Sequence, residues 1–131
     1  MRFLACCLLL LVGMCSGRAI AVGTMSLAAS CAGLSARADV LLPALRRDWP
    51  QVRALALRGD AQAEPAAARM DAALAAGRGL ELGAAWPRVE VAALAGIEAE
   101  LAAQEIGPTG AQIARTLVEQ FGRDVAAMGG Q

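Results

Sequence analysis

The side chains that most often carry enzyme chemistry are few in this chain and lie near its start. The sequence contains no His, Lys, Tyr or Asn, and its four Cys and four Ser all fall within the first 35 residues. Beyond them the only hydroxyl groups belong to Thr109 and Thr116. Nucleophile–base pairs, His metal clusters, Schiff-base lysines and Tyr acids all need the missing types. We therefore predict no enzyme activity, no catalytic residues, no metal site and no cofactor, and we see no evident small-molecule substrate.

The carboxylates are the remaining candidates for chemistry. Glu98 and Glu105 are seven residues apart and could share a helix face, whereas Glu100 points elsewhere. No His, Cys or Asn accompanies them and the spacing does not match a calcium-binding loop, so we interpret them as solvated. The 12 Arg residues balance 12 acidic residues and are spread along the chain. This balance leaves no basic excess for phosphate groups and argues against nucleic-acid binding.

The first 36 residues contain two uncharged runs, 3–17 and 19–36, separated by Arg18. A membrane-spanning helix needs about 20 apolar residues, and neither run offers them comfortably. Joining the runs would bury Arg18 near the bilayer centre, at a cost of about 2.5–3.5 kcal/mol. A positive start followed by apolar and then small residues is more typical of an export leader. A single-span membrane anchor stays as an alternative.

Two cleavage points compete in this leader. Ala19-Ile20-Ala21 fits ordinary signal peptidase and would release a soluble periplasmic or secreted binding protein starting at Val22. The segment Leu27-Ala28-Ala29-Ser30-Cys31 resembles the lipobox of bacterial lipoprotein precursors, although Ala28 stands where Leu is commonest. The resemblance covers the leader only. It implies that Cys31 is the mature N-terminus and carries lipid (palmitate).

The distribution of cysteines favours the lipobox. No Cys follows Cys31, so there is no disulfide framework, and cleavage after Ala21 would leave a lone thiol in an oxidising compartment. We predict a signal peptide over 1–30, with Met14 as an alternative start, a tether over 31–37 and a helical domain over 38–131. Ala32 resembles the residues that permit export to the outer membrane, which places the protein at that membrane's periplasmic face; the inner membrane is an alternative.

The body from residue 38 onward is rich in Ala and poor in β-branched residues, which predicts an all-α fold. We expect Pro50 to kink or restart the first helix, with Asp48 as its N-cap. The expected helices cover Asp39–Gly59, Pro65 to Gly77, Trp86 to before Gly107, and Thr109 to Gly129, with a linker over 78–85.

The last of these helices has the clearest signal. Thr109-Gly110-Ala111-Gln112 matches a capping box. Ile113, Leu117, Phe121 and Val125 recur every four residues and predict a core-facing stripe rather than a partner-binding face. Glu119 and Arg123 are placed to form an i,i+4 ion pair.

An internal similarity organises the body. Trp49-Pro50-Gln51-Val52 reappears 37 residues later as Trp86-Pro87-Arg88-Val89, and the segment after Pro65 resembles that after Pro108, displaced by 43. Each unit would be a helical hairpin opened by Trp-Pro, and two hairpins make a small four-helix bundle. We expect both Trp rings to be packing anchors. The sequence thus indicates a small non-enzymatic envelope lipoprotein, held to the membrane through Cys31, whose helical domain contacts an envelope protein.

Overall fold

The computed structural model describes the backbone over residues 18–129 and the side chains over residues 38–129. The chain divides between Asp39 and Val40, and the part that follows forms a body of four helices. The helices are α2 (Arg18–Gly59), α3 (Glu64–Ala76), α4 (Gly79–Ala102) and α5 (Pro108–Met128), with the short helix η1 (Ala61–Ala63) after α2. The predicted all-α, four-helix body is therefore confirmed. The predictions for residues 1–37 fall outside the described side chains and stay predictions.

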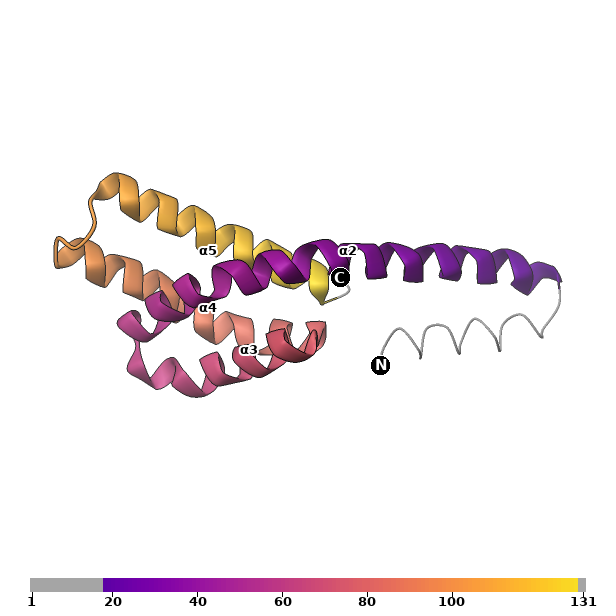
Figure 1. Ribbon diagram of the computed structural model, residues 1–131, viewed down its shortest axis with the longest axis horizontal. Coiled ribbons are helices and arrows are strands. Elements are labelled where there is room, and N and C mark those ends of the chain that lie inside the picture. The colour runs from indigo at the N-terminus through magenta and orange to yellow at the C-terminus, as the bar shows by residue number, and fades with distance from the viewer. Residues whose placement is uncertain (1–17, 130–131) are drawn as a thin grey trace. The chain divides into compact units, whose positions relative to one another are not determined.

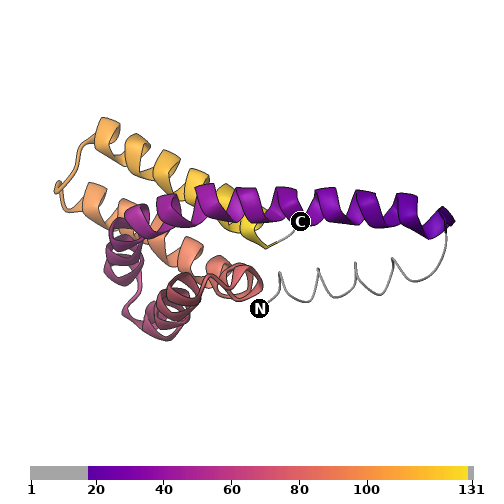
Figure 2. The ribbon, with the colours of Figure 1, turned by 45° about the vertical axis from the view of Figure 1, so that its right-hand side comes forward.

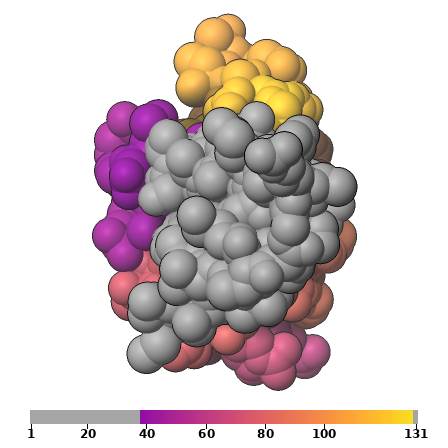
Figure 3. Space-filling view, turned by 90° about the vertical axis from the view of Figure 1, so that its right-hand side faces the viewer, coloured from indigo at the N-terminus to yellow at the C-terminus, as the bar shows by residue number. Residues whose placement is uncertain are grey.

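Helix α4 lies at the centre of the body, packed against α3 on one side and α5 on the other (Figures 1 and 2). Viewed from the end, α5 and α3 lie on opposite sides of the body (Figure 3). The part of α2 that follows Val40 lies across the other three helices and contacts each of them, as its hydrogen bonds and ring contacts show. The body therefore consists of the two expected hairpins, α2–α3 and α4–α5.

Two glycines bring α2 and α4 into backbone contact. A Cβ atom on Gly96 would lie 1.9 Å from the carbonyl oxygen of Leu55, and one on Gly59 would lie 2.0 Å from that of Ala92. Only glycine permits so close an approach. Gly59 and Gly96 are also 37 residues apart, so the two halves of the sequence similarity meet at this crossing.

The core confirms the 37-residue similarity for the first helix of each hairpin. Leu45, Trp49, Val52 and Ala56 on α2 are buried, and so are their counterparts on α4, which are Leu82, Trp86, Val89 and Ala93. The second helices match in a different register: α3 and α5 begin 44 residues apart rather than 43. The displacement of 43 pairs buried Met70 with exposed Ile113, whereas 44 pairs it with buried Ala114. The predicted register of the second helices is thus wrong by one residue.

The expected restart near Pro50 is wrong, because α2 continues through both Pro43 and Pro50. The carboxylate of Asp48 accepts hydrogen bonds from Arg47. Trp49 and Val52 are both buried, and an unbroken helix keeps them on the same face. A proline tolerated on the exposed side of a helix costs one backbone hydrogen bond, and burial of its neighbours compensates for that loss.

The expected linker over 78–85 is also wrong, because α4 begins at Gly79. Leu82 is buried three residues before Ala85 and four before Trp86, which are also buried. This spacing places the three side chains on one face of a helix, so their burial favours helix over loop. Gly79 has a packing role: a Cβ atom there would lie 2.0 Å from the carbonyl oxygen of Met128. Trp86 and Pro87 consequently lie inside α4 and do not open it. By contrast, the predicted stop of α3 at Gly77 is confirmed, with φ of 67°.

The predicted N-cap of α5, Thr109, is two residues late, and the predicted capping box is absent. Gly107 is the N-cap and Pro108 follows it in the first turn, while no side chain caps the helix. The buried face consists of Ala111, Ala114, Val118, Phe121 and Val125. Leu117 is partly buried and packs against the core, as predicted, whereas Ile113 is 64% exposed, so the predicted stripe is wrong at Ile113.

The reason is geometric. Successive residues of an α-helix turn by about 100°, so a row taken every four residues drifts by about 40° at each step. Ile113 therefore lies about 120° from Val125 around the helix, although both belong to the same row in the sequence. The predicted ion pair between Glu119 and Arg123 is replaced by a hydrogen bond from Arg123 to the side chain of Gln120.

Candidate functional site

Three aromatic rings from three helices meet at the centre of the body. The ring centroid of Phe121 on α5 lies 5.8 Å from that of Trp49 on α2 and 4.9 Å from that of Trp86 on α4. Each Trp is 7% exposed. Tilted pairs at these distances are favourable beyond the area they bury. The rings thus join the two hairpins, which agrees with the predicted role of both Trp residues as packing anchors.

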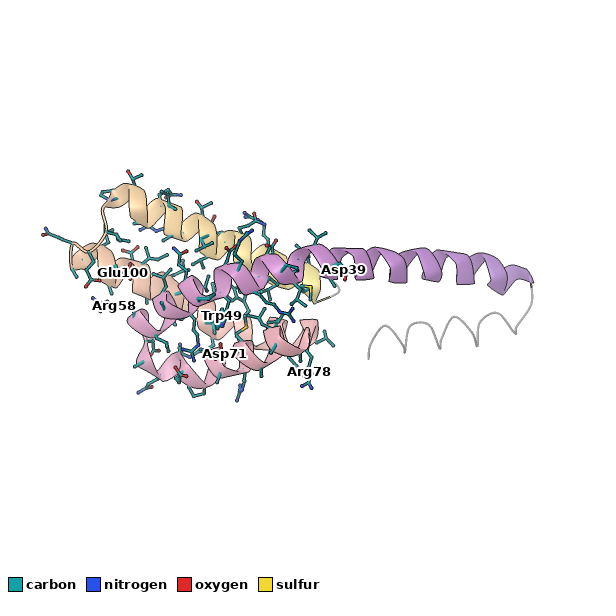
Figure 4. The ribbon with its side chains drawn as sticks, in the orientation of Figure 1. Asp39, Trp49, Arg58, Asp71, Arg78 and Glu100 are labelled. Carbon is teal, nitrogen blue, oxygen red and sulfur yellow. The ribbon has the colours of Figure 1, made fainter. Side chains whose placement is uncertain are left out.

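Each indole N–H is bound by a carboxylate. The Nε1 atom of Trp49 on α2 donates to Asp71 on α3 at 2.6 Å (both residues are labelled in Figure 4). The Nε1 atom of Trp86 donates to Glu90 on its own helix at 2.8 Å. Buried indole N–H groups generally find an acceptor. Neither Trp therefore presents a free donor to a ligand. The absence of a side chain at Gly122 makes room for the second ring, because a Cβ atom there would lie 2.9 Å from Nε1 of Trp86.

Asp71 also belongs to an ionic network at the surface. Arg53 on α2 approaches Asp71 on α3 at 3.1 Å and Glu64, at the start of the same helix, at 2.8 Å. About two turns earlier on α2, Arg46 donates to the carbonyl oxygen of Leu74 at 3.0 Å, near the C-terminus of α3. These arginines hold α3 along α2 at both ends of the hairpin. Exposed pairs of this kind are worth little singly, so they orient helices more than they stabilise them.

A second set of ion pairs connects the hairpins. Arg88 on α4 binds Asp60, just after α2, and Arg58 on α2 binds Glu105, just after α4. The hydrogen bond from Arg88, together with the backbone N–H of Gln62, lowers the pKa of the Asp60 carboxyl below its usual value. The two loops that close the α2 and α4 helices are thus each fixed by an arginine from the opposite hairpin.

The candidate carboxylates do not form a common site. Glu98 lies on α4 and pairs with Arg115 of α5 at 2.6 Å, whereas Glu105 lies beyond the end of α4 and pairs with Arg58. The expectation that they share a helix face is therefore wrong. Among the residues that the structure describes, no group of three or more His, Cys, Asp or Glu could hold a metal ion. Within the same residues, no helix has an apolar stretch sufficient to cross a membrane.

A surface feature that the sequence analysis does not predict is a row of exposed apolar side chains on the outer side of α4. Leu80, Val91 and Leu94 are large apolar residues that are 55%, 65% and 38% exposed. They are aligned along the helix opposite its buried face. The spacing of these residues could have revealed the row, but the predicted linker over 78–85 separates Leu80 from Val91 and Leu94.

Comparison with known proteins identifies no relative: no protein family, no curated protein and no solved structure matches this chain. The predicted lipidation site, Cys31, lies within the bounds of α2 but outside the described side chains. The function is therefore argued from the residues themselves.

Proposed function

We propose that this chain is a small, non-enzymatic lipoprotein of the bacterial cell envelope, with lipid on Cys31 and an interaction domain over residues 38–131. The observation that carries the proposal is the run of small residues Ala28-Ala29-Ser30 directly before Cys31, followed by a body without any Cys. A single acylated cysteine at the mature N-terminus accounts for both facts. It removes the free thiol that would otherwise face an oxidising compartment.

The body supports a role in contact rather than catalysis. The described polar groups nearest its core are engaged in structural bonds, as the carboxylates of Asp71 and Glu90 are by the two indoles. The carboxylates of Glu98 and Glu105 form ion pairs with arginines of other helices. No buried side-chain nitrogen or oxygen lacks a partner in the described part of the chain. Polar side chains that are all engaged within the fold favour a domain that acts through its surface, by contact with a partner.

Labelling with palmitate tests the proposal. We expect the wild-type chain to incorporate label in a bacterial host, and Cys31→Ala to lose it and accumulate as the longer precursor. Cys15→Ala is the matched control, because that residue lies in the predicted leader and its removal should leave labelling unchanged. A mature protein that begins at Val22 would contradict the proposal and support the secreted alternative.

The destination follows from the second mature residue. With Ala32 next to the acylated cysteine, we expect the protein to fractionate with the outer membrane on a sucrose gradient. Ala32→Asp resembles the arrangement that retains lipoproteins, so this variant should shift to the inner membrane. Inner-membrane retention of the wild-type chain would contradict this assignment.

A further inference from the structure

The outer face of α4 carries an uninterrupted row of apolar residues. Leu80, Ala84, Pro87, Val91 and Leu94 are all exposed, and they are centred opposite the buried side of the helix. Single apolar residues scattered over a surface are ordinary, whereas apolar residues aligned on one helix face indicate a surface that another molecule covers. Glu81 and Arg88 lie along one flank of the row and pair with Arg78 and Asp60. Glu98 follows Leu94 on the same face, where it ends the apolar row and pairs with Arg115.

The spacing of the row indicates what would cover it. Its members follow one another by four, three, four and three residues, which is the a/d repeat of a coiled-coil seam. A narrow row of this period fits another helix, because a helix that contacts a broader surface shows a wider apolar face. Val91 and Ala84 take the a positions, and Leu80, Pro87 and Leu94 take the d positions. In coiled coils, a β-branched residue at a with Leu at d favours a parallel pair of two helices.

We propose that the occupant is α4 of a second copy of this chain, paired in parallel about a two-fold axis. A two-fold interface needs the same patch on both partners, and a single heptad seam provides this. The position of Arg88 favours the parallel arrangement over the antiparallel one, and Glu98, one turn beyond Leu94, is paired with Arg115 of its own copy. An antiparallel pair centred on the row would bring the two Arg88 side chains together near the axis, whereas parallel helices place Arg88 next to Gly83 of the other copy.

The attachment of the body gives a second argument for the parallel pair, and this one rests on the proposed lipid anchor. The chain enters the body at the end where α4 starts, because a Cβ atom on Gly77 would lie 3.3 Å from a methyl of Leu42 (Figure 1). Cys31 precedes Val40 by nine positions, so the chain between them reaches at most about 30 Å. Parallel pairing keeps both attachment ends on the same side. An antiparallel pair centred on the row would set the start of one α4 beside residue 95 of the other, so the two attachment ends would lie about 24 Å apart along the helices.

The same anchor explains how a short seam can suffice. The row covers fewer than three heptads, so the isolated bodies should associate only weakly in solution. Two anchored copies share a membrane surface, and this raises their effective concentration and presents them in one orientation. We therefore expect the dimer on membranes and a monomer once the anchor is absent.

Cysteine cross-linking of the full chain in bacterial membranes tests the pairing. In a background of Cys6→Ala, Cys7→Ala and Cys15→Ala, the single changes Leu80→Cys and Leu94→Cys should each give covalent dimers on mild oxidation. Ala68→Cys is the matched control, since Ala68 is exposed on α3 away from the row. We expect at least tenfold less dimer from this control. Adding Val91→Glu to Leu94→Cys should lower the dimer yield by a similar factor.

Three outcomes would overturn the pairing. They are equal cross-linking at Ala68→Cys, no cross-linking at either seam position, or cross-linking only in mixtures of Leu80→Cys with Leu94→Cys, which would indicate an antiparallel pair. Palmitate labelling of the same cells separates this inference from the proposed function. Label without seam cross-links refutes the dimer alone. Seam cross-links without label support the α4 pair but refute both the lipoprotein assignment and the dependence of the pairing on a lipid anchor.

Discussion

Replacing Gly96 by Ala should destabilise the body, although Ala is the better helix former. The added Cβ atom would lie 1.9 Å from the carbonyl oxygen of Leu55, whereas carbon and oxygen normally approach to about 3.3 Å. The obstacle is backbone on a facing helix, so α2 and α4 must separate by more than about 1 Å. A gap of that size forfeits a quarter to a half of the dispersion energy of the atoms that face each other.

The magnitude follows from two opposing contributions. Overpacking costs typically about 1–3 kcal/mol, and the rigid backbone at this crossing places Gly96→Ala near the upper value. The helix propensity of Ala returns about 1 kcal/mol. We therefore expect the free energy of unfolding to fall by about 2 kcal/mol. For a domain of this size, that loss lowers the melting temperature by about 8–16 °C.

Gly83→Ala is the matched control on the same helix. A Cβ atom at Gly83 would have no neighbour within 4 Å, so only the propensity gain of up to about 1 kcal/mol should remain. The assay is urea denaturation of a fragment covering residues 38–131, followed by far-ultraviolet circular dichroism. Both variants should stay helical, with midpoints displaced in opposite directions. A Gly96→Ala midpoint equal to or above wild type would refute the close contact between α2 and α4.

Three further predictions use the same fragment. Trp49→Ala and Trp86→Ala should each cost about 3–5 kcal/mol and nearly unfold it; wild-type melting with loss of a binding partner would instead make the rings surface contacts. Ile113→Ala should change the free energy of unfolding by less than about 0.5 kcal/mol, whereas Val118→Ala should cost well over that, and the reverse order would contradict the α5 face described here. Because Arg88 lowers the pKa of Asp60, the stabilisation by this carboxylate is present at pH values above the pKa of the unfolded chain and is lost as the pH falls through the pKa of the folded chain. The free energies of unfolding of wild type and Asp60→Asn should therefore approach each other as the pH falls below about 3.8. A difference in stability that grows below that pH would contradict this sign.

The sequence predicts the helical class and the hairpin order because composition, Pro and Gly act locally. The stop at Gly77 needs only a left-handed residue, and the start of α3 needs only a proline in its first turn. The errors occur where contacts distant in sequence decide the outcome. Glycine at position 79 suggests a loop, but it is required because the backbone of Met128, at the end of α5, lies too close to leave room for a Cβ atom. No local pattern contains that information.

The exposed and buried residues of α5 illustrate a different limit. Ile113 and Val118 are equally apolar, and only the angular position of each residue around the helix decides which one is buried. The candidate site shows the same dependence on position. The types of Trp49 and Trp86 suggest anchors, but their carboxylate partners come from α3 in one case and from α4 in the other. The sequence similarity between the hairpins therefore predicts the rings and not their acceptors.

Comparison of the two hairpins bears on the role of the outer face of α4. The buried faces of α2 and α4 carry matching residues at Leu45 and Leu82, at both Trp residues, and at Gly59 and Gly96. Their outer faces match at Pro50 and Pro87 and at Leu57 and Leu94. They differ at the three other positions of the row, where Pro43, Arg47 and Ala54 on α2 correspond to Leu80, Ala84 and Val91 on α4. The fold constrains the inner face of both helices equally, so it does not account for a more apolar outer face on α4 alone. A partner that contacts α4 and not α2 does account for it, and the parallel pair of α4 helices is such a partner.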